Sequence, residues 1–173
     1  MRKIYDHQHR KVRAAIAEVF WDYTLVGQPG AMTRDEMLAL FIRIKDSDYF
    51  EQHRGNYGLK IGWADLEGKH WGMYFHGSQE IYIEQELGDP RTLCHEVAHH
   101  LALQQARDVP HHGPTFCTHY LNLLYLFVGK AEAEGLKWAF DEHEVDYFFL
   151  DTLLADDMRK LMFAQSSTQS QLA

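Results

Sequence analysis

Two histidines and a glutamate lie within five consecutive residues, in the order His95, Glu96 and His99. On a helix, residues four apart share one face, so both imidazoles could grip a single metal ion. Zinc prefers nitrogen and sulfur ligands in tetrahedral geometry, and a catalytic site leaves its fourth position to water. Zinc lowers the pKa of that water to about 7, and Glu96 stands beside it as a general base. The spacing therefore predicts a hydrolytic zinc site.

The third ligand must come from outside this pentapeptide. The histidine candidates are His111, His112 and His119, and a carboxylate elsewhere in the chain could also serve. His112 precedes Gly113 and Pro114, a rigid entry to a helix that can hold a ligand against the preceding helix. His111 is better placed to face solvent. We therefore expect His95, His99 and His112 to bind Zn²⁺, a set that could also accommodate other first-row ions.

The pairing of HEVAHH with a downstream HGPTF resembles the SprT-like zinc metallopeptidases, which include the Spartan DNA-protein crosslink protease and carry HExxH followed by HGPxF. By this resemblance His95, His99 and His112 bind zinc and Glu96 is catalytic, as the chemical argument also predicts. The similarity covers about residues 55–128. SprT-like proteins often add a four-cysteine zinc ribbon, whereas this chain has two cysteines and no basic tail. A smaller, related branch of HExxH metallohydrolases fits the sequence equally well.

Helices are expected on both sides of a small sheet. Apolar residues recur at helical spacing over about residues 5–23, and Thr33 and Glu36 form a capping box for a helix that runs to about Lys45. Residues 55–87 hold three glycine-punctuated runs rich in aromatic and β-branched residues, which predict three mostly antiparallel strands.

The motif residues fall on a helix that follows this sheet. The run RTLCHEVAHHLALQQA has no proline or glycine, and Pro114 suits the start of the next helix. Two further helices are predicted over residues 130–141 and 145–163, followed by a polar, disordered tail at 164–173. We therefore expect an α+β fold in one domain over residues 1–163, with N-terminal helices, the sheet, a zincin-like motif helix and a following ligand-bearing helix.

Several residues near the motifs have a structural and a functional interpretation. His100 is expected to be a solvated histidine, the alternative being a group that supports the ligands from outside. Cys94 and Cys117 are expected to be buried small hydrophobes. A hydroxyl of Tyr120 or Tyr125 could donate to the oxyanion of a tetrahedral intermediate, although a place in the core is favoured for both.

The strand at residues 80–86 alternates isoleucine with polar residues and directly precedes the motif helix. A strand at the edge of a sheet can bind an extended peptide through its free backbone groups. We therefore consider this strand a candidate edge for peptide binding.

Composition limits the classes of function that fit. The chain has 173 residues, a formal net charge of −8 and only two cysteines, which fits one domain of a reducing compartment. We find no signal peptide and no run of about 18 apolar residues, so a cytoplasmic protein without a membrane span is expected. The negative charge opposes nonspecific DNA binding, so DNA as a partner is unsupported, and the oligomeric state is open.

These features together predict a zinc metallopeptidase that acts on a protein or peptide substrate. The alternative is a non-catalytic, zinc-stabilised interaction module or DNA-associated module. Glu96 argues against a purely structural zinc, because such a site needs no carboxylate beside an open coordination position.

Overall fold

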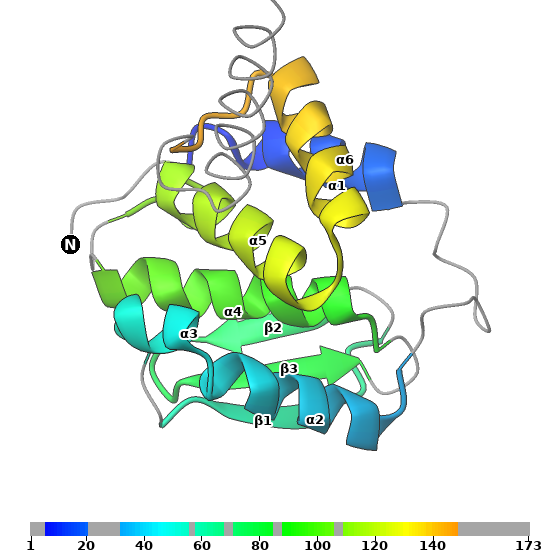
Figure 1. Ribbon diagram of the computed structural model, residues 1–173, viewed down its shortest axis with the longest axis vertical. Helices are drawn as coiled ribbons and strands as arrows, with labels where there is room; N and C mark the ends of the chain where they lie inside the picture. The colour runs from blue at the N-terminus through cyan, green and yellow to red at the C-terminus, as the bar shows by residue number, and fades with distance from the viewer. Residues whose placement is uncertain are drawn as a thin grey trace, which may run out of the picture.

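The computed structural model describes residues 6–20, 32–55, 58–67, 71–84, 88–105 and 109–148. Within these residues, six helices and three strands follow one another in the order α1 (His9–Phe20), α2 (Arg34–Lys45), α3 (Asp48–Gln52), β1 (Lys60–Ala64), β2 (Gly72–Phe75), β3 (Glu80–Glu84), α4 (Pro90–Gln105), α5 (Pro114–Phe127) and α6 (Lys130–Glu142). The predicted α+β class is confirmed, and Figure 1 shows the sheet on one side of α4 and the later helices on the other.

The helices differ from the sequence predictions at two places. The short helix α3 was not expected; it begins after Ser47, whose hydroxyl accepts a hydrogen bond from the Phe50 amide at 3.2 Å. The helix predicted over 145–163 is absent from its described part, since residues 145–148 are not helical. Its remainder and the tail at 164–173 lie outside the described residues.

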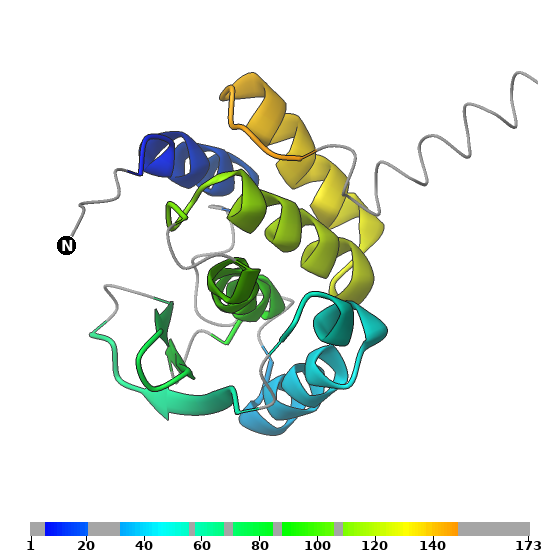
Figure 2. The same cartoon turned by 90° about the vertical axis from the view of Figure 1, so that its left-hand side faces the viewer.

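Helix α4 runs through the middle of the molecule. It packs against α5 on one side and against β2 and β3 on the other, with α2 alongside. Figure 2 shows α4 end-on at the centre, enclosed by the sheet and the other helices. Leu93, Val97 and Leu101 form an apolar stripe on α4 that is fully buried, and the polar residues Glu96 and His100, on other sides of the helix, are buried as well.

The three strands form a mixed sheet in the order β1-β3-β2. The pair β2 and β3 is antiparallel, with Tyr74 opposite Ile81, as expected. The pair β1 and β3 is parallel, with Trp63 opposite Ile83, so the arrangement is not mostly antiparallel. The physical reason is that the chain passes from β1 to the far side of β3 before it turns back.

The strand that precedes α4 is therefore not an edge. β3 lies between β1 and β2, which corrects the expectation of a free edge at residues 80–86. Within the described sheet the edges are β1 and β2, and β2 has the more extensive packing against α4.

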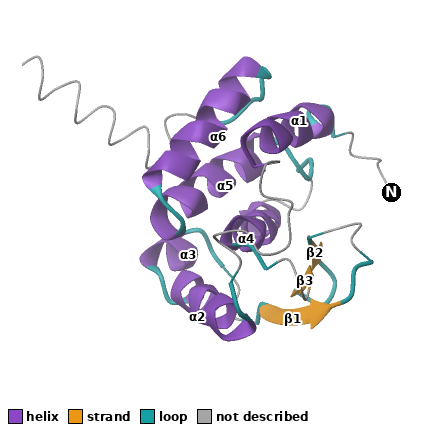
Figure 3. Cartoon of the chain, turned by 90° about the vertical axis from the view of Figure 1, so that its right-hand side faces the viewer, coloured by secondary structure: helices purple, strands orange, loops and turns teal. Residues whose placement is uncertain are grey.

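The N-terminal helix α1 packs against α6, the last helix of the described residues. α6 in turn lies against α5, as Figure 3 also shows. Val12 and Ala15 of α1 and Leu136 of α6 are fully buried. This packing brings the first described residues close to the loop that enters α5.

Within the described residues, no helix combines the length and the apolar character that a membrane span requires.

Candidate metal centre

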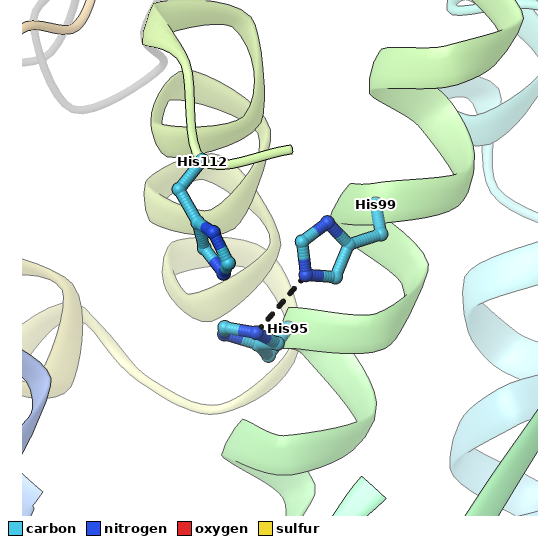
Figure 4. Close-up of side chains that lie close together, drawn as sticks. All are labelled: His95, His99 and His112. Carbon is cyan, nitrogen blue, oxygen red and sulfur yellow. Dashed lines mark hydrogen bonds between the residues drawn. The ribbon is translucent and has the colours of Figure 1, made fainter. Parts of the chain in front are cut away.

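Three histidine side chains converge between α4 and the loop that enters α5. His95 and His99 lie one turn apart on α4, and their Nε2 atoms are 3.2 Å apart. Two ligands placed 2.0 to 2.1 Å from a tetrahedral zinc ion lie about 3.3 Å from each other, so this spacing fits zinc. His112 completes the group, and the ligand atoms of the three residues all lie within 4.8 Å of one another. Figure 4 shows the three rings turned toward one another. These histidines could hold a metal ion.

The sequence HGPTF explains why His112 lies against α4. A turn in which the Gly113 amide donates to the Pro110 carbonyl at 3.0 Å leads into α5, and Pro114 occupies its first turn. Pro114 fits there because a first-turn residue has no helical partner for an amide hydrogen. His112 lies within this turn, directly before the helix, so the turn fixes its position.

Phe116 supplies an apolar support for all three histidines. Its ring is fully buried and stacks on His99 with the ring centroids 4.3 Å apart. The rings of His95 and His112 contact it edge-on, with centroids 4.9 Å and 5.0 Å away. Packing on one rigid ring limits the rotamers of the ligands, which favours a preorganised metal site.

The three histidines are neutral at physiological pH. Burial, together with the smaller effects of neighbouring His112 and His9, lowers the pKa of His95 to about 3. Burial also lowers the pKa of His99 well below its ordinary value. For His112, burial lowers the pKa, while a hydrogen bond with Asp6 opposes the change. Neutral imidazole is the form that binds a metal, so protons do not compete for these sites at neutral pH.

Glu96 lies beside His95 and is 6% exposed, which makes it one of the few buried carboxylates among the described residues. Burial raises its pKa to about 8, and a hydrogen bond from the Tyr74 backbone acts in the opposite direction. Strand β2 passes close to the Glu96 side chain at Gly72. A Cβ atom on Gly72 would lie 2.9 Å from Glu96 Cγ and 2.7 Å from Thr92 Cγ2. Glycine at position 72 thus makes room for the glutamate.

A pocket of about 540 Å³ opens beside His95 and Glu96. Tyr120 contributes to its lining and is 2% exposed, with its ring centroid 5.2 Å from that of His95. Burial raises the pKa of Tyr120 well above 10, so its hydroxyl stays protonated and can donate a hydrogen bond. One face of α1 forms another wall, with the residues His9, Arg13, Ile16, Ala17 and Phe20.

The remaining ligand candidates lie outside the cluster. His111 is exposed, with its ring centroid 6.0 Å from that of His99, as expected of a solvent-facing neighbour. His119 is buried elsewhere, and its Nδ1 lies 2.8 Å from the Tyr49 hydroxyl. Of the histidine candidates for the third position, only His112 joins the group.

His100 is not a solvated residue, contrary to expectation. Its side chain is fully buried, and its Nδ1 lies 3.0 Å from the Tyr74 hydroxyl. The ring stacks on Phe50 with centroids 5.8 Å apart. The prediction was wrong because it treated α4 as a surface helix, whereas the sheet and α2 cover that side. His100 thus links α4 to β2, the strand whose backbone contacts Glu96 at Tyr74.

The two cysteines and two tyrosines near the motifs were all expected to lie in the core. Cys94 and Cys117 are free and fully buried, which confirms their interpretation as small hydrophobes. Tyr120 is buried, as favoured, but it also lines the pocket. Tyr125 is only partly buried and packs against the core, away from the pocket lining.

The sequence argument missed a second contribution to the site, which comes from the N-terminus. The Asp6 carboxylate accepts a hydrogen bond from His112 Nδ1 at 2.8 Å, and Gln8 and His9 also contact the His112 residue. The only signal in the sequence is the polar run DHQH ahead of an amphipathic helix, and nothing in its spacing points to a partner about 100 residues away.

No family model matches the sequence, and no curated protein or solved structure matches the chain. The resemblance to SprT-like metallopeptidases therefore rests on the two motifs, HEVAHH and HGPTF, and stays a prediction.

Proposed function

We propose that this protein is a zinc-dependent hydrolase that cleaves peptide bonds in a protein or peptide substrate. The observation that carries the proposal is the convergence of three neutral histidines beside a buried carboxylate, at the wall of a pocket of about 540 Å³. Bound zinc would supply Lewis-acid polarisation of a carbonyl and of water.

Glu96 is the group proposed to move protons. Its carboxylate lies in the pocket next to His95, and burial brings its pKa to about 8 in the metal-free protein. A general base works best when its pKa is near the working pH, and a nearby cation would bring this one down toward neutrality. Glu96 then takes a proton from the attacking water and delivers it to the leaving amine.

Tyr120 is the candidate for stabilising charge on the substrate. Its hydroxyl is protonated at neutral pH, and its ring borders the same pocket as Glu96. A preorganised donor of this kind lowers the barrier by stabilising the oxyanion that forms on the substrate carbonyl.

The edge strand β2 favours a peptide as the substrate. It borders Glu96 at Gly72 and Tyr74 and is an edge within the described sheet. An extended peptide can add to such an edge through backbone hydrogen bonds. The role first considered for residues 80–86 thus passes to β2.

The test is a time course of cleavage of an unfolded protein by zinc-loaded wild type, beside a Glu96→Gln variant of equal zinc content. We expect the wild type to cut and the variant to lose activity by at least about 100-fold, the lower range for a missing general base. The reaction is repeated with single-stranded and double-stranded DNA to test for DNA-dependent activity. If both proteins bind zinc and neither cuts under any condition, the zinc is structural or the substrate is not a protein.

A further inference from the structure

We propose that Asp6 is the positioning residue of the third metal ligand, so that the N-terminal segment is a working part of the metal centre. This inference rests on the metal site of the proposed function but not on peptide cleavage. Three atoms of His112 are held by side chains of the segment: its amide nitrogen and Nδ1 by Asp6, and its carbonyl oxygen by Gln8.

Within the described part of the chain, the Asp6 carboxylate accepts its hydrogen bonds from His112. Its Oδ2 accepts a bond from the His112 amide at 3.1 Å and another from His112 Nδ1 at 2.8 Å. Oδ1 of Asp6 is buried and has no hydrogen-bond partner among the described residues. The His112 and Asp6 side chains are only 14% and 21% exposed, so water screens their contact little.

This contact decides which nitrogen of His112 can bind a metal. A neutral imidazole has one N–H, and the carboxylate holds it on Nδ1. The lone pair is then on Nε2, on the far side of the ring. A carboxylate behind a ligand histidine fixes its tautomer and its orientation and makes it a stronger donor.

Gln8 fastens the segment that carries Asp6 to the ligand loop. Its side-chain amide donates to the His112 carbonyl at 2.7 Å and to the Asp146 carbonyl at 3.1 Å, and its oxygen accepts from the Asp146 amide at 2.9 Å. Gln8 is 7% exposed. The start of α1, the ligand loop and the segment after α6 are thereby joined at one side chain.

The zinc dissociation constant tests the assignment, measured by competition with a chelator. We expect Asp6→Asn, which keeps the size of the side chain, to weaken zinc binding about 10-fold to 100-fold, the usual effect of removing such a partner. The matched control is Asp35→Asn, an exposed carboxylate of α2 away from the cluster, which should stay within about twofold of the wild type. Thermal melts of the metal-free proteins show whether each variant folds.

A double-mutant cycle separates positioning from a general structural role. If Asp6 acts through the imidazole, Asp6→Asn should change zinc affinity no more than about threefold once His112→Ala is present. In cobalt-loaded protein, Asp6→Asn should also alter the visible d–d bands, which report ligand geometry. Asp6→Glu should recover part of the lost affinity.

Three results would overturn the inference: zinc affinity of Asp6→Asn within threefold of the wild type, an equal loss with and without the His112 imidazole, or no zinc binding by the wild type. The last result would remove the proposed function as well. Zinc binding that depends on Asp6, without any cleavage of protein, would leave this inference standing and reject the peptidase.

Discussion

Acid should destabilise the metal-free protein through its buried histidines, and His100 gives the clearest case. Its side chain is fully buried, stacks on Phe50 and contacts the Tyr74 hydroxyl. Burial, followed by the nearby charges of His76 and Lys45, lowers the pKa of His100 from 6.5 to about 4. The folded protein therefore resists protonation of this ring.

The sign of the effect follows from the two pKa values. Between pH 6.5 and about 4, the unfolded chain binds a proton at His100 and the folded chain does not. The free energy of unfolding therefore falls as the pH drops through this window. One pKa unit corresponds to about 1.4 kcal/mol, and integration from pH 7 to pH 5 gives a loss of about 2 kcal/mol from His100 alone.

Urea unfolding at pH 7 and pH 5, in the presence of a chelator, measures this loss. His100→Gln removes the titrating group but keeps an acceptor for the Tyr74 hydroxyl, while the other buried histidines are common to both proteins. We expect the variant to lose about 2 kcal/mol less than the wild type between the two pH values. Equal losses in the wild type and His100→Gln would refute the reasoning.

Three further predictions concern the site. Gly72→Ala places a Cβ 2.9 Å from Glu96 Cγ, so we expect a stability loss of about 1 to 3 kcal/mol in urea unfolding and a lower kcat. Tyr120→Phe should lower kcat about 100-fold to 1000-fold in steady-state assays with little change in KM or zinc affinity, if its hydroxyl stabilises the oxyanion. His112→Ala should weaken zinc binding by at least about 100-fold in chelator competition, because losing a ligand costs more than losing its outer partner, whereas His111→Ala should have little effect.

Local sequence rules predicted the parts of the site that local geometry determines. The i, i+4 spacing of His95 and His99 requires only a helix, and their Nε2 atoms do meet at 3.2 Å. The capping box also formed as predicted, with the Thr33 amide donating to Glu36 Oε2 at 2.8 Å and the Glu36 amide donating to Thr33 Oγ1 at 3.3 Å. In both cases the interacting residues are neighbours along the chain.

Features that depend on tertiary packing were either not predicted from the sequence or predicted wrongly. Asp6 and His112 meet only because α1 packs on α6, and the two residues are 106 positions apart. The burial of His100 depends on α4 being enclosed on most sides, which helical periodicity does not reveal. The position of β3 between β1 and β2 depends on a crossover that strand-length patterns cannot specify.

The features that oppose stability at this site favour catalysis over a purely structural metal. Burial disfavours the ionised form of Glu96 and raises its pKa to about 8, so the carboxylate does not stabilise the metal-free fold at neutral pH. Gly72, which makes room for it, costs backbone entropy within a strand. A structural zinc site needs only its ligands, and an apolar side chain at position 96 would pack there without this cost. Because such costs are concentrated where function requires them, the pairing of Gly72 with a buried Glu96 beside three histidines supports the hydrolase proposal.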